Sequence, residues 1–401
     1  MKSVRLLAVA AAIAVVVSAC TNGGAASSAA GGAASSAYTY KIGFVGSLTG
    51  GNATIGQSWL QAINVWKNTI IPDGKINGHP VEFTVRDDQS NPDIGVQQVT
   101  DLATSVNVIA LDGGTFASVL MAVAPLVDDR YHVPLMRIAA HYQENEPYMN
   151  WAFATLIDHT LAATKMVAFA QQKGWTKLAV VSSDDAFGQS MNQVVQARIK
   201  SAGLTIVDNE IVPYTAPDST PQMARVREAS PDAVIFYAAG SGATTAWKNL
   251  RQVGFNGPIL LNPAFQDKTV YQAVGTLVDG AYIITNGIDG CPTNSAQKLA
   301  FDALHKGGVA NVNFIHTATW AGLDILKNAL EQANIDPDPS KLETERARLR
   351  DQIEKTQNYV GASGVVSYAP NNHLGISSSS YVWGVFKGPD FVPLDQSLCL
   401  Q

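Results

Sequence analysis

Three pairs of adjacent aspartates are the first candidates for acid–base chemistry in this sequence: Asp87–Asp88, Asp128–Asp129 and Asp184–Asp185. The first and third pairs come directly after apolar runs that are typical of strands. Adjacent side chains at a strand end point to opposite faces, so neither pair is a ready acid/base pair. The second pair comes at the end of a predicted helix with no partner in view. All three pairs are therefore interpreted as turn, capping or solvated groups.

Motifs of the common enzyme classes are missing. The sequence contains no G-x-S-x-G nucleophile elbow, no G-x-x-x-x-G-K-[ST] phosphate loop and no H-E-x-x-H zinc motif. No two of the seven histidines are spaced i, i+4. We therefore expect a protein that is not an enzyme, with no catalytic residues, no metal and no cofactor. A secreted hydrolase is kept as a remote alternative.

Composition and charge restrict the class of protein. The chain has 401 residues, of which 46% are hydrophobic and 15% are charged, and its net charge is -6. This length indicates two or three domains with ample core, and the low charge excludes a disordered tail protein. The acidic balance and the lack of Lys/Arg runs argue against nucleic acid as a partner. Three cysteines are too few for a disulfide-scaffolded fold.

The N-terminal residues are typical of an export signal. Lys2 and Arg5 precede an apolar run over 6–17, which is too short to span a membrane and is followed by small residues. The tetrapeptide over 17–20 resembles a bacterial lipobox, in which the chain is cleaved before the cysteine and a lipid is attached to its sulfur. We therefore predict a signal peptide over 1–19 and lipidation of Cys20. The alternative is a simple signal peptide followed by an incidental cysteine.

The next segment, 21–37, is predicted to be a flexible linker. Fifteen of its 17 residues are Ala, Gly or Ser, a composition that cannot bury enough apolar surface to fold. A linker between a lipid-bearing cysteine and a folded body indicates an extracytoplasmic protein held on the outer face of the cell membrane. In an oxidising compartment the other two cysteines, Cys291 and Cys399, are expected to form a disulfide, with two buried thiols as the alternative.

Strand-like and helix-like runs alternate from Tyr40 onward. VEFTVRDD alternates apolar and polar residues, whereas Trp59, Ile63, Trp66 and Ile70 recur at helical spacing. Such alternation is typical of βαβ units with parallel sheets. Helices are expected, among others, over 118–128, 190–202, 295–306, 317–333 and 340–356.

This alternation occurs twice before the last strands return, so we predict an α/β protein. It has two doubly wound lobes with parallel central sheets, joined by a hinge of three crossings near Asp158, Asn286 and Ile376. The predicted N-terminal lobe covers 38–157 plus 287–375, and the predicted C-terminal lobe covers 158–286 plus 376–401.

Six loops at the carboxyl ends of predicted strands are the candidate ligand site, because open parallel sheets bind ligands there. They are rich in Gly, Ser, Thr and aromatic residues, and they cover 47–52, 113–118, 139–142, 183–188, 237–244 and 262–266. Hydroxyl groups and free N–H groups at helix starts suit a carboxylate. Phe116, Phe187, Tyr237 and Phe265 are candidate apolar walls. The alternatives are ordinary turns for the glycines and core packing for the aromatics.

Several phrases in order along the chain are similar to one family. They are KIGFVGSLTGGNATIGQ, VRDDQSNPDIGVQQVTDL, VAPLVDDRYHVPLM, VVSSDDAFGQS, SPDAVIFYAAG and LRQVGFNGPIL. Nearly all of 40–393 resembles the substrate-binding proteins of branched-chain-amino-acid-type ABC transporters, which have the periplasmic binding protein type I fold. The resemblance implies two lobes that close on a small solute, with the ligand carboxylate bound by loop backbone and hydroxyl groups of the first lobe.

The strand-end loops and the alignment on this family together give candidate ligand-binding residues from both lobes. They are Thr115, Phe116, Ser118, Ala139, Ala140, His141, Phe187, Tyr237, Ser241, Phe265 and Gln266.

Some family positions differ here. The family usually has small hydroxyl residues where Phe116, Ala117 and His141 stand, and Ser-Pro where Arg137-Ile138 stands. Amino-acid binders hold the ligand ammonium with a carboxylate where Ala264 aligns, although slippage could bring Asp267 or Asp184 there. A buried ammonium without such a partner is costly. Arg137 either faces the cleft and favours an anion or pairs structurally with an acid.

The expected function is capture of a small amino acid, amide or carboxylate and its delivery to an ABC permease with ATPase subunits. The protein is expected to be a monomer. The alternative is a sensing module that reports the ligand to a signalling receptor, since both functions use the same closure.

Overall fold

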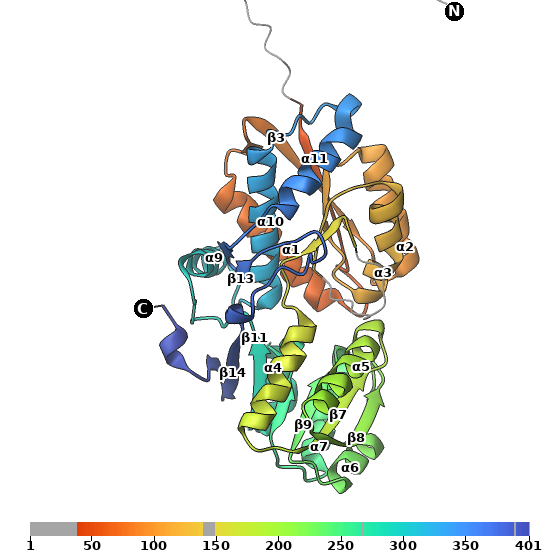
Figure 1. Cartoon of the computed structure of the whole chain (residues 1–401), viewed down its shortest axis with the longest axis vertical. Helices are drawn as coiled ribbons and strands as arrows, with labels where there is room; N and C mark the ends of the chain where they lie inside the picture. The colour runs from red at the N-terminus through yellow and green to blue at the C-terminus, as the bar shows by residue number, and fades with distance from the viewer. Residues whose placement is uncertain (1–37, 139–148, 267, 279, 389, 401) are drawn as a thin grey trace, which may run out of the picture. The chain divides into compact units, whose positions relative to one another are not determined.

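The computed structural model describes residues 38–138, 149–266, 268–278, 280–388 and 390–400 (Figure 1). The predicted signal peptide, Cys20 and the linker lie outside these residues, as do Ala139, Ala140 and His141. None of the helices in the described ranges combines the length and apolar character needed to cross a membrane. The same residues contain no group of three or more His, Cys, Asp or Glu that could hold a metal ion.

The N-terminal lobe is built on a six-stranded sheet in the order β2-β3-β1-β4-β5-β6. All neighbours pair in parallel except β2 and β3, which pair antiparallel. β1 pairs with both β3 and β4, so it lies inside the sheet. The strands are β1 (Tyr40–Gly46), β2 (Lys75–Ile76), β3 (His79–Asp87), β4 (Ala110–Gly113), β5 (Leu135–Arg137) and β6 (Ala152–Ala154).

Helices cover both faces of this sheet. Trp59, Ile63 and Trp66 of α1 pack with α10 residues against one face, and Val119 and Leu120 of α3 pack with α2 against the other. The first of these faces therefore depends on α10, which comes from a distant part of the chain. The helices are α1 (Ala53–Ile70), α2 (Pro92–Asp101), α3 (Ala117–Pro125), α9 (Ser295–Lys306), α10 (Phe314–Gln332) and α11 (Leu342–Glu354).

The C-terminal lobe contains a seven-stranded sheet in the order β15-β14-β11-β10-β9-β7-β8. The predicted parallel sheet is only partly confirmed, because β14 and β15 pair antiparallel at one edge. These two strands form a hairpin near the C-terminus, and a hairpin requires antiparallel strands. The strands are β7 (Lys177–Ser183), β8 (Thr205–Val212), β9 (Ala233–Tyr237), β10 (Ile259–Leu261), β11 (Ala281–Thr285), β14 (Val382–Lys387) and β15 (Asp390–Pro393).

This second sheet is also covered on both faces. Apolar residues of α4 and α5 pack on one face and those of α6, α7 and α8 on the other. The helices are α4 (His159–Gln172), α5 (Ala186–Ser201), α6 (Thr220–Glu228), α7 (Gly240–Gln252) and α8 (Lys268–Val274). Helices on both faces of two mostly parallel sheets confirm the predicted α/β class with two doubly wound lobes.

The chain passes between the two sheets three times. It leaves the first sheet after β6, returns to α9 after β11, and leaves again after the hairpin of β12 (Tyr359–Gly361) and β13 (Gly364–Val366). Near the second passage, Asn286 Nδ2 donates a hydrogen bond of 3.0 Å to the Ser363 carbonyl, which ties two of the connecting segments together.

Local capping shifts some helix boundaries from the predicted ones. The helix predicted over 190–202 begins at Ala186, because the Asp185 side chain accepts from the Gly188 N–H and caps it. The helix predicted over 118–128 changes to a π-helical turn, η2 (Leu126–Arg130), directly after Pro125. A proline removes one backbone donor from the helical ladder, so a break at this position is expected physically. The predicted helix over 295–306 is confirmed by α9.

Asp112 on β4 is a carboxyl group buried in the centre of the N-terminal sheet. Its Oδ1 accepts a hydrogen bond from Trp59 Nε1 at 2.5 Å, and its Oδ2 has no hydrogen-bond partner among the described residues. Burial raises the pKa of Asp112 to about 7, although the bond from Trp59 acts in the opposite direction. The folded protein therefore favours the neutral carboxyl.

Asp112→Asn is expected to change how stability depends on pH. Because the folded-state pKa lies above the unfolded one, wild-type stability falls as pH rises between about 4 and 7, by about 1.4 kcal/mol per pH unit from this group. The variant lacks that loss. Its free energy of unfolding relative to wild type, measured in urea, should therefore rise by about 2–3 kcal/mol between pH 5 and pH 8.

Asp395→Asn is the matched control for this measurement. Hydrogen bonds from Ser397 lower the pKa of Asp395, so both folded and unfolded states are ionised from pH 5 to pH 8. An Asp112→Asn difference that is equal at the two pH values would contradict the buried neutral carboxyl.

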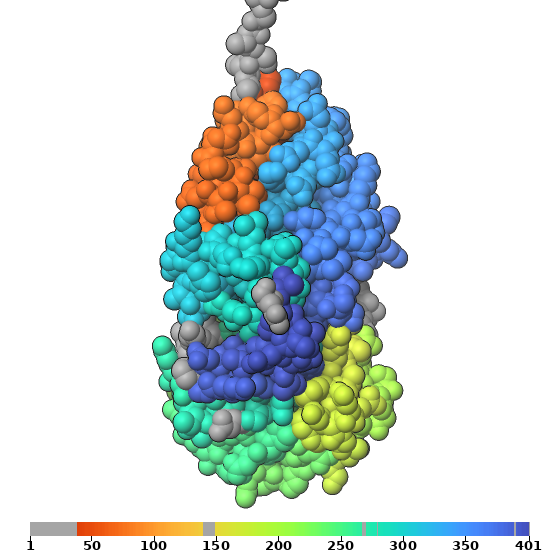
Figure 2. All heavy atoms as spheres, turned by 90° about the vertical axis from the view of Figure 1, so that its left-hand side faces the viewer, coloured from red at the N-terminus to blue at the C-terminus, as the bar shows by residue number. Residues whose placement is uncertain are grey.

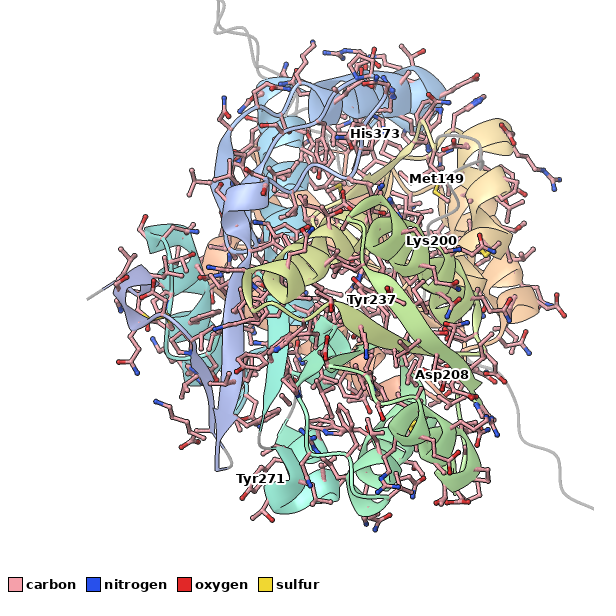
Figure 3. The ribbon with its side chains drawn as sticks, turned by 60° about the horizontal axis from the view of Figure 1, so that its bottom comes forward. Met149, Lys200, Asp208, Tyr237, Tyr271 and His373 are labelled. Atoms are coloured by element: carbon pink, nitrogen blue, oxygen red, sulfur yellow. A yellow bond between two sulfur atoms is a disulfide. The ribbon has the colours of Figure 1, made fainter. Side chains whose placement is uncertain are left out.

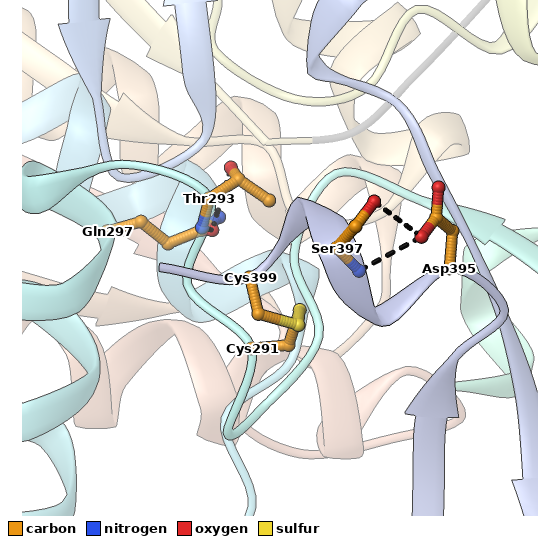
Figure 4. The surroundings of a disulfide bond; sticks show 6 residues. All are labelled: Cys291, Thr293, Gln297, Asp395, Ser397 and Cys399. Carbon is orange, nitrogen blue, oxygen red and sulfur yellow. Dashed lines mark hydrogen bonds between the residues drawn. A yellow bond between two sulfur atoms is a disulfide. The ribbon is translucent and has the colours of Figure 1, made fainter. Parts of the chain in front are cut away.

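A disulfide joins Cys291 to Cys399, as predicted, across 108 positions of sequence (Figure 4). Beside it, Ser397 N and Oγ both bond to Asp395 Oδ1, and Leu400 N donates to the Pro292 carbonyl at 2.7 Å. Figure 2 shows the C-terminal segment, in dark blue, running along the segment that precedes α9. The bond therefore ties the end of the chain to the region between β11 and α9.

Replacing both cysteines by serine is expected to lower the free energy of unfolding by about 2–4 kcal/mol, because the unfolded chain regains the entropy of a long loop. Thermal or urea unfolding measures the loss. Reductant should destabilise the wild type by a similar amount and leave the double variant unchanged. A wild type indifferent to reductant under unfolding conditions would contradict the bond's contribution.

Candidate functional site

Two neighbouring cavities lie at the carboxyl ends of strands from both sheets. The large cavity has a volume of about 570 Å³ and the small cavity about 80 Å³. They share six lining residues, so we treat them as two parts of one site. The shared residues are Asn52, Ile55, Tyr214, Ala239, Ala264 and Phe314.

The N-terminal side of the site rests on hydrogen bonds between loops that follow neighbouring strands. Thr115 Oγ1 accepts from the Ser47 N–H at 2.8 Å, and Asn52 Nδ2 donates to the Thr115 carbonyl at 2.8 Å. Ser47 Oγ in turn donates to Asp88 Oδ1 at 2.6 Å. These bonds connect the loops after β1, β3 and β4. The polar groups of Thr115 and Asn52 are therefore largely used to hold the wall of the site.

Tyr214, in the loop after β8, belongs to the C-terminal lobe and contacts the N-terminal lobe. Its backbone N–H donates to Asp184 Oδ1 at 2.7 Å, and its carbonyl accepts from the Gly242 N–H at 2.9 Å. Its hydroxyl donates to Asn52 Oδ1 at 3.2 Å, and its ring lies 5.9 Å from that of Phe116. Burial raises the pKa of Tyr214 to about 12, so this hydroxyl stays a donor.

A glycine permits this arrangement beside Tyr214. Gly240, the first residue of α7, has φ +80°, and a Cβ there would lie 2.3 Å from the Tyr214 carbonyl oxygen. Only glycine fits both the backbone angle and the close approach. The start of α7 can therefore contact the Tyr214 backbone while Ser241 lines the large cavity.

Aromatic residues and a histidine form one end of the small cavity. Phe187 and His159 both line it, with ring centroids 5.0 Å apart in an edge-on arrangement. Behind them, the Tyr237 hydroxyl lies 2.8 Å from His159 Nδ1. Burial, together with the charge of Arg137, lowers the pKa of His159 to about 3. The imidazole is therefore neutral at physiological pH.

The predicted ligand residues occupy three kinds of place. Thr115 and Phe187 line the small cavity, and Ser241 and Gln266 line the large one. Phe116, Ser118, Tyr237 and Phe265 line neither cavity among the described residues. Ala139, Ala140 and His141 lie outside the described residues.

Two of the predicted aromatic walls are instead core residues. Phe265 packs in the core of the C-terminal lobe, with its ring 5.7 Å from that of Trp247 and 6.2 Å from that of Phe236. Tyr237, labelled in Figure 3, is fully buried and bonds to His159. For these residues the core-packing alternative describes the structure, and Tyr237 contacts the cavity wall through His159 and Phe187.

Sequence reasoning missed His159, Tyr214 and Phe314. Tyr214 follows a predicted strand, so the rule that ligands bind at carboxyl ends of strands could have included its loop. His159 and Phe314 are the first residues of helices capped by Asp158 and Asn313. Caps are visible in sequence, but the meeting of these two helix starts at one cavity is not.

The described charges of the site are few. Asp185 lines the small cavity, with its Oδ1 held by Ser183 Oγ and the Gly188 N–H. Lys248 is the one charged residue among the described residues lining the large cavity. Ala264, where amino-acid binders place a carboxylate, lines both cavities with a methyl group. An acidic side chain therefore lines the small cavity and a basic side chain lines the large one.

Arg137 lies beside other charged and polar groups rather than on the walls formed by described residues. Its charge lowers the pKa of Asp158 in opposition to burial, which acts more strongly in the other direction. The same charge also acts to lower the pKa values of His159 and Tyr368. These neighbours favour the structural reading of Arg137 over a direct part in the cavity.

Comparisons with known proteins agree with this geometry. Residues 39–388 match the family described as periplasmic binding protein. A Leu/Ile/Val-binding protein of Rhizobium johnstonii is 24% identical over 85% of this chain and 91% of its own length.

Two solved structures show the same fold. An extracellular ligand-binding receptor of Rhodopseudomonas palustris is 24% identical, with a TM-score of 0.79, over 88% of this chain and 99% of its own. A leucine-binding protein of Thermotoga maritima is 18% identical, with a TM-score of 0.74, over 88% and 97%. The chain therefore belongs to the periplasmic binding protein family, whose members bind solutes outside the cytoplasm and are not enzymes.

Proposed function

We propose that the protein captures a small amino acid, amide or carboxylate in the joined cavities and delivers it to an ABC permease. The observation that carries the proposal is that loops from both sheets line the same two cavities. A solute held there contacts both lobes at once. Because those contacts exist together only when the lobes are close, binding shifts the hinge equilibrium towards the closed form.

Side chains that suit an ammonium and a carboxylate both line the site. Asp185 is our candidate for holding an ammonium, because it lines the small cavity. Asp184 Oδ1 already accepts from the Tyr214 N–H, and Ala264 has no carboxylate. In the large cavity, Lys248 and Ser241 suit a carboxylate. The Rhizobium relative named for Leu, Ile and Val supports an amino acid. A carboxylate without an amine would need only Lys248 and Ser241.

Several walls of the two cavities are apolar. Ile55 and Phe314 line both cavities, and Phe187 lines the small one. Such a surface favours a solute with an aliphatic or aromatic body, since burial of apolar area stabilises the complex. The site therefore suits an amphipathic solute better than a sugar or an inorganic ion.

Native mass spectrometry of the purified protein is the direct test of this function. Transfer from native to denaturing conditions should release a small molecule of one of the three classes. If the protein is purified without ligand, a thermal-shift panel of compounds from the same classes replaces mass spectrometry. A ligand that binds only the folded state raises the midpoint of thermal unfolding. Hydrolysis of an amide from that panel, instead of saturable binding, would contradict the proposal.

Phe187→Ala should weaken binding of the identified ligand by about tenfold or more, because most of one buried apolar side chain is lost from the wall. Isothermal titration measures the affinity. Tyr38→Ala is the matched control, since Tyr38 is an exposed aromatic outside the cavities and its loss should leave affinity unchanged. Equal affinity in wild type and Phe187→Ala would place the ligand elsewhere.

We also propose that a lipid on Cys20 holds the protein on the outer face of the membrane, through the linker over 21–37. Cys20→Ala should then move the protein from the membrane fraction to the soluble fraction of the native host, as immunoblotting of the two fractions would show. Cys291→Ser is the control, because it removes a different cysteine and leaves the anchor intact. Retention of Cys20→Ala in the membrane would contradict lipid anchoring.

A further inference from the structure

His159 has one side turned to the core and also forms part of the wall of the small cavity. It is the first residue of α4 and is 4% exposed. Among the described residues lining this cavity, the other titratable side chains are Asp185 and Tyr214. Ile55, Ile138 and Leu156 surround them with apolar walls. A histidine in such a place acts through whichever ring nitrogen is left unpaired.

The hydrogen bonds of Tyr237 decide which nitrogen of His159 carries the proton. Tyr237 Oη lies 2.8 Å from His159 Nδ1 and donates to the His159 carbonyl oxygen at 3.1 Å. A phenol has one proton, so Nδ1 must supply the proton for the other bond. If the phenol instead donated to Nδ1, its oxygen would face the carbonyl oxygen with no proton between them. The arrangement that satisfies both contacts is the Nδ1–H tautomer.

This tautomer leaves Nε2 with a free lone pair. No described residue donates a hydrogen bond to Nε2, since the bonds of His159 all run to Tyr237 or along α4. Burial raises the pKa of Tyr237 well above its usual value, so the phenol keeps its proton. A solute donor that forms a hydrogen bond to this unpaired acceptor would stabilise the complex.

We propose that His159, held in its Nδ1–H tautomer by Tyr237, is a specificity-determining residue whose Nε2 accepts a hydrogen bond from an O–H or N–H group of the solute. This inference rests on the proposed function and deepens it by naming the group that the small cavity selects. A solute carboxylate there would face two acceptors, His159 Nε2 and Asp185, and would be repelled.

Nitrogen NMR of the imidazole tests the tautomer without any ligand. In the purified ¹⁵N-labelled protein, long-range proton–nitrogen correlation should show a protonated Nδ1 and an unprotonated Nε2 for His159, assigned by their loss in His159→Gln. Tyr237→Phe should convert this pattern into a mixture of both tautomers in the folded protein. A wild-type His159 with the proton on Nε2, or on both nitrogens, would overturn the proposal.

Three probes that share one alkyl body and one carboxylate test the selected group. On the carbon next to the carboxylate, L-leucine carries an ammonium, 2-hydroxy-4-methylpentanoate carries a hydroxyl, and 4-methylpentanoate carries no donor. By isothermal titration, wild type should bind the first two at least about tenfold more tightly than the third. His159→Phe should reduce the advantage of the hydroxy acid to near unity, and His159→Gln, which keeps an acceptor, should retain part of it.

The outcomes separate the two proposals. His305→Gln is the control, because His305 bonds to Asp289 and the Val309 carbonyl and lines neither cavity. Equal binding of the hydroxy acid and 4-methylpentanoate, or a preference that survives His159→Phe, would overturn only the role of His159. No binding of any probe would contradict capture of an aliphatic amino acid or carboxylate, and with it the inference that rests on that capture.

Discussion

The parallel pairing of β1 with both β3 and β4 is the constraint on which the N-terminal half of the site depends. Parallel strands end at the same edge of a sheet, so the loops after them meet there and can bond to one another. The contacts from Ser47 to Thr115 and to Asp88 follow from this alignment. Parallel strands also require crossover helices, which cover both faces and leave that edge as the place for a solute.

A backbone approach between two strands makes this edge possible. Gly113, at the end of β4, has φ +146°, and a Cβ there would lie 1.9 Å from the Val45 carbonyl oxygen of β1. A side chain at this position would push the two strands apart just where the Thr115 loop begins. The close approach therefore sets where Thr115 lies relative to β1, and through Asn52 it sets one wall of the cavities.

Helix caps then decide which residues reach the cavities. Asp158, Asp185 and Asn313 each accept a backbone hydrogen bond at the start of a helix. A cap fixes where its helix begins, and so fixes the direction of the next one or two side chains. The residues that follow these caps are His159, Phe187 and Phe314, and all three line the small cavity. Short polar side chains thus position apolar walls.

The chemistry of the site departs from the amino-acid-binding pattern in where its charges lie. Ala264 has no carboxylate, and Asp185 approaches from a different strand end. Neutral His159 lines the small cavity together with Asp185, whereas Lys248 lines the large cavity. The polar groups of a solute would therefore meet acceptors at the starts of α4 and α5 and a cation on α7.

The sequence by itself determined the fold class, the family and the disulfide. Strand and helix periodicities are local, and the low number of cysteines left one pair to form in an oxidising compartment. It did not determine the antiparallel edge strands β14 and β15, because periodicity does not state strand direction. Only the tertiary structure decided that Phe187 faces the cavity whereas Phe265 and Tyr237 are core, and that Tyr214 and His159 belong to the site. An aromatic residue after a strand suits a binding wall and a core equally well, and the choice depends on which distant helix packs over it.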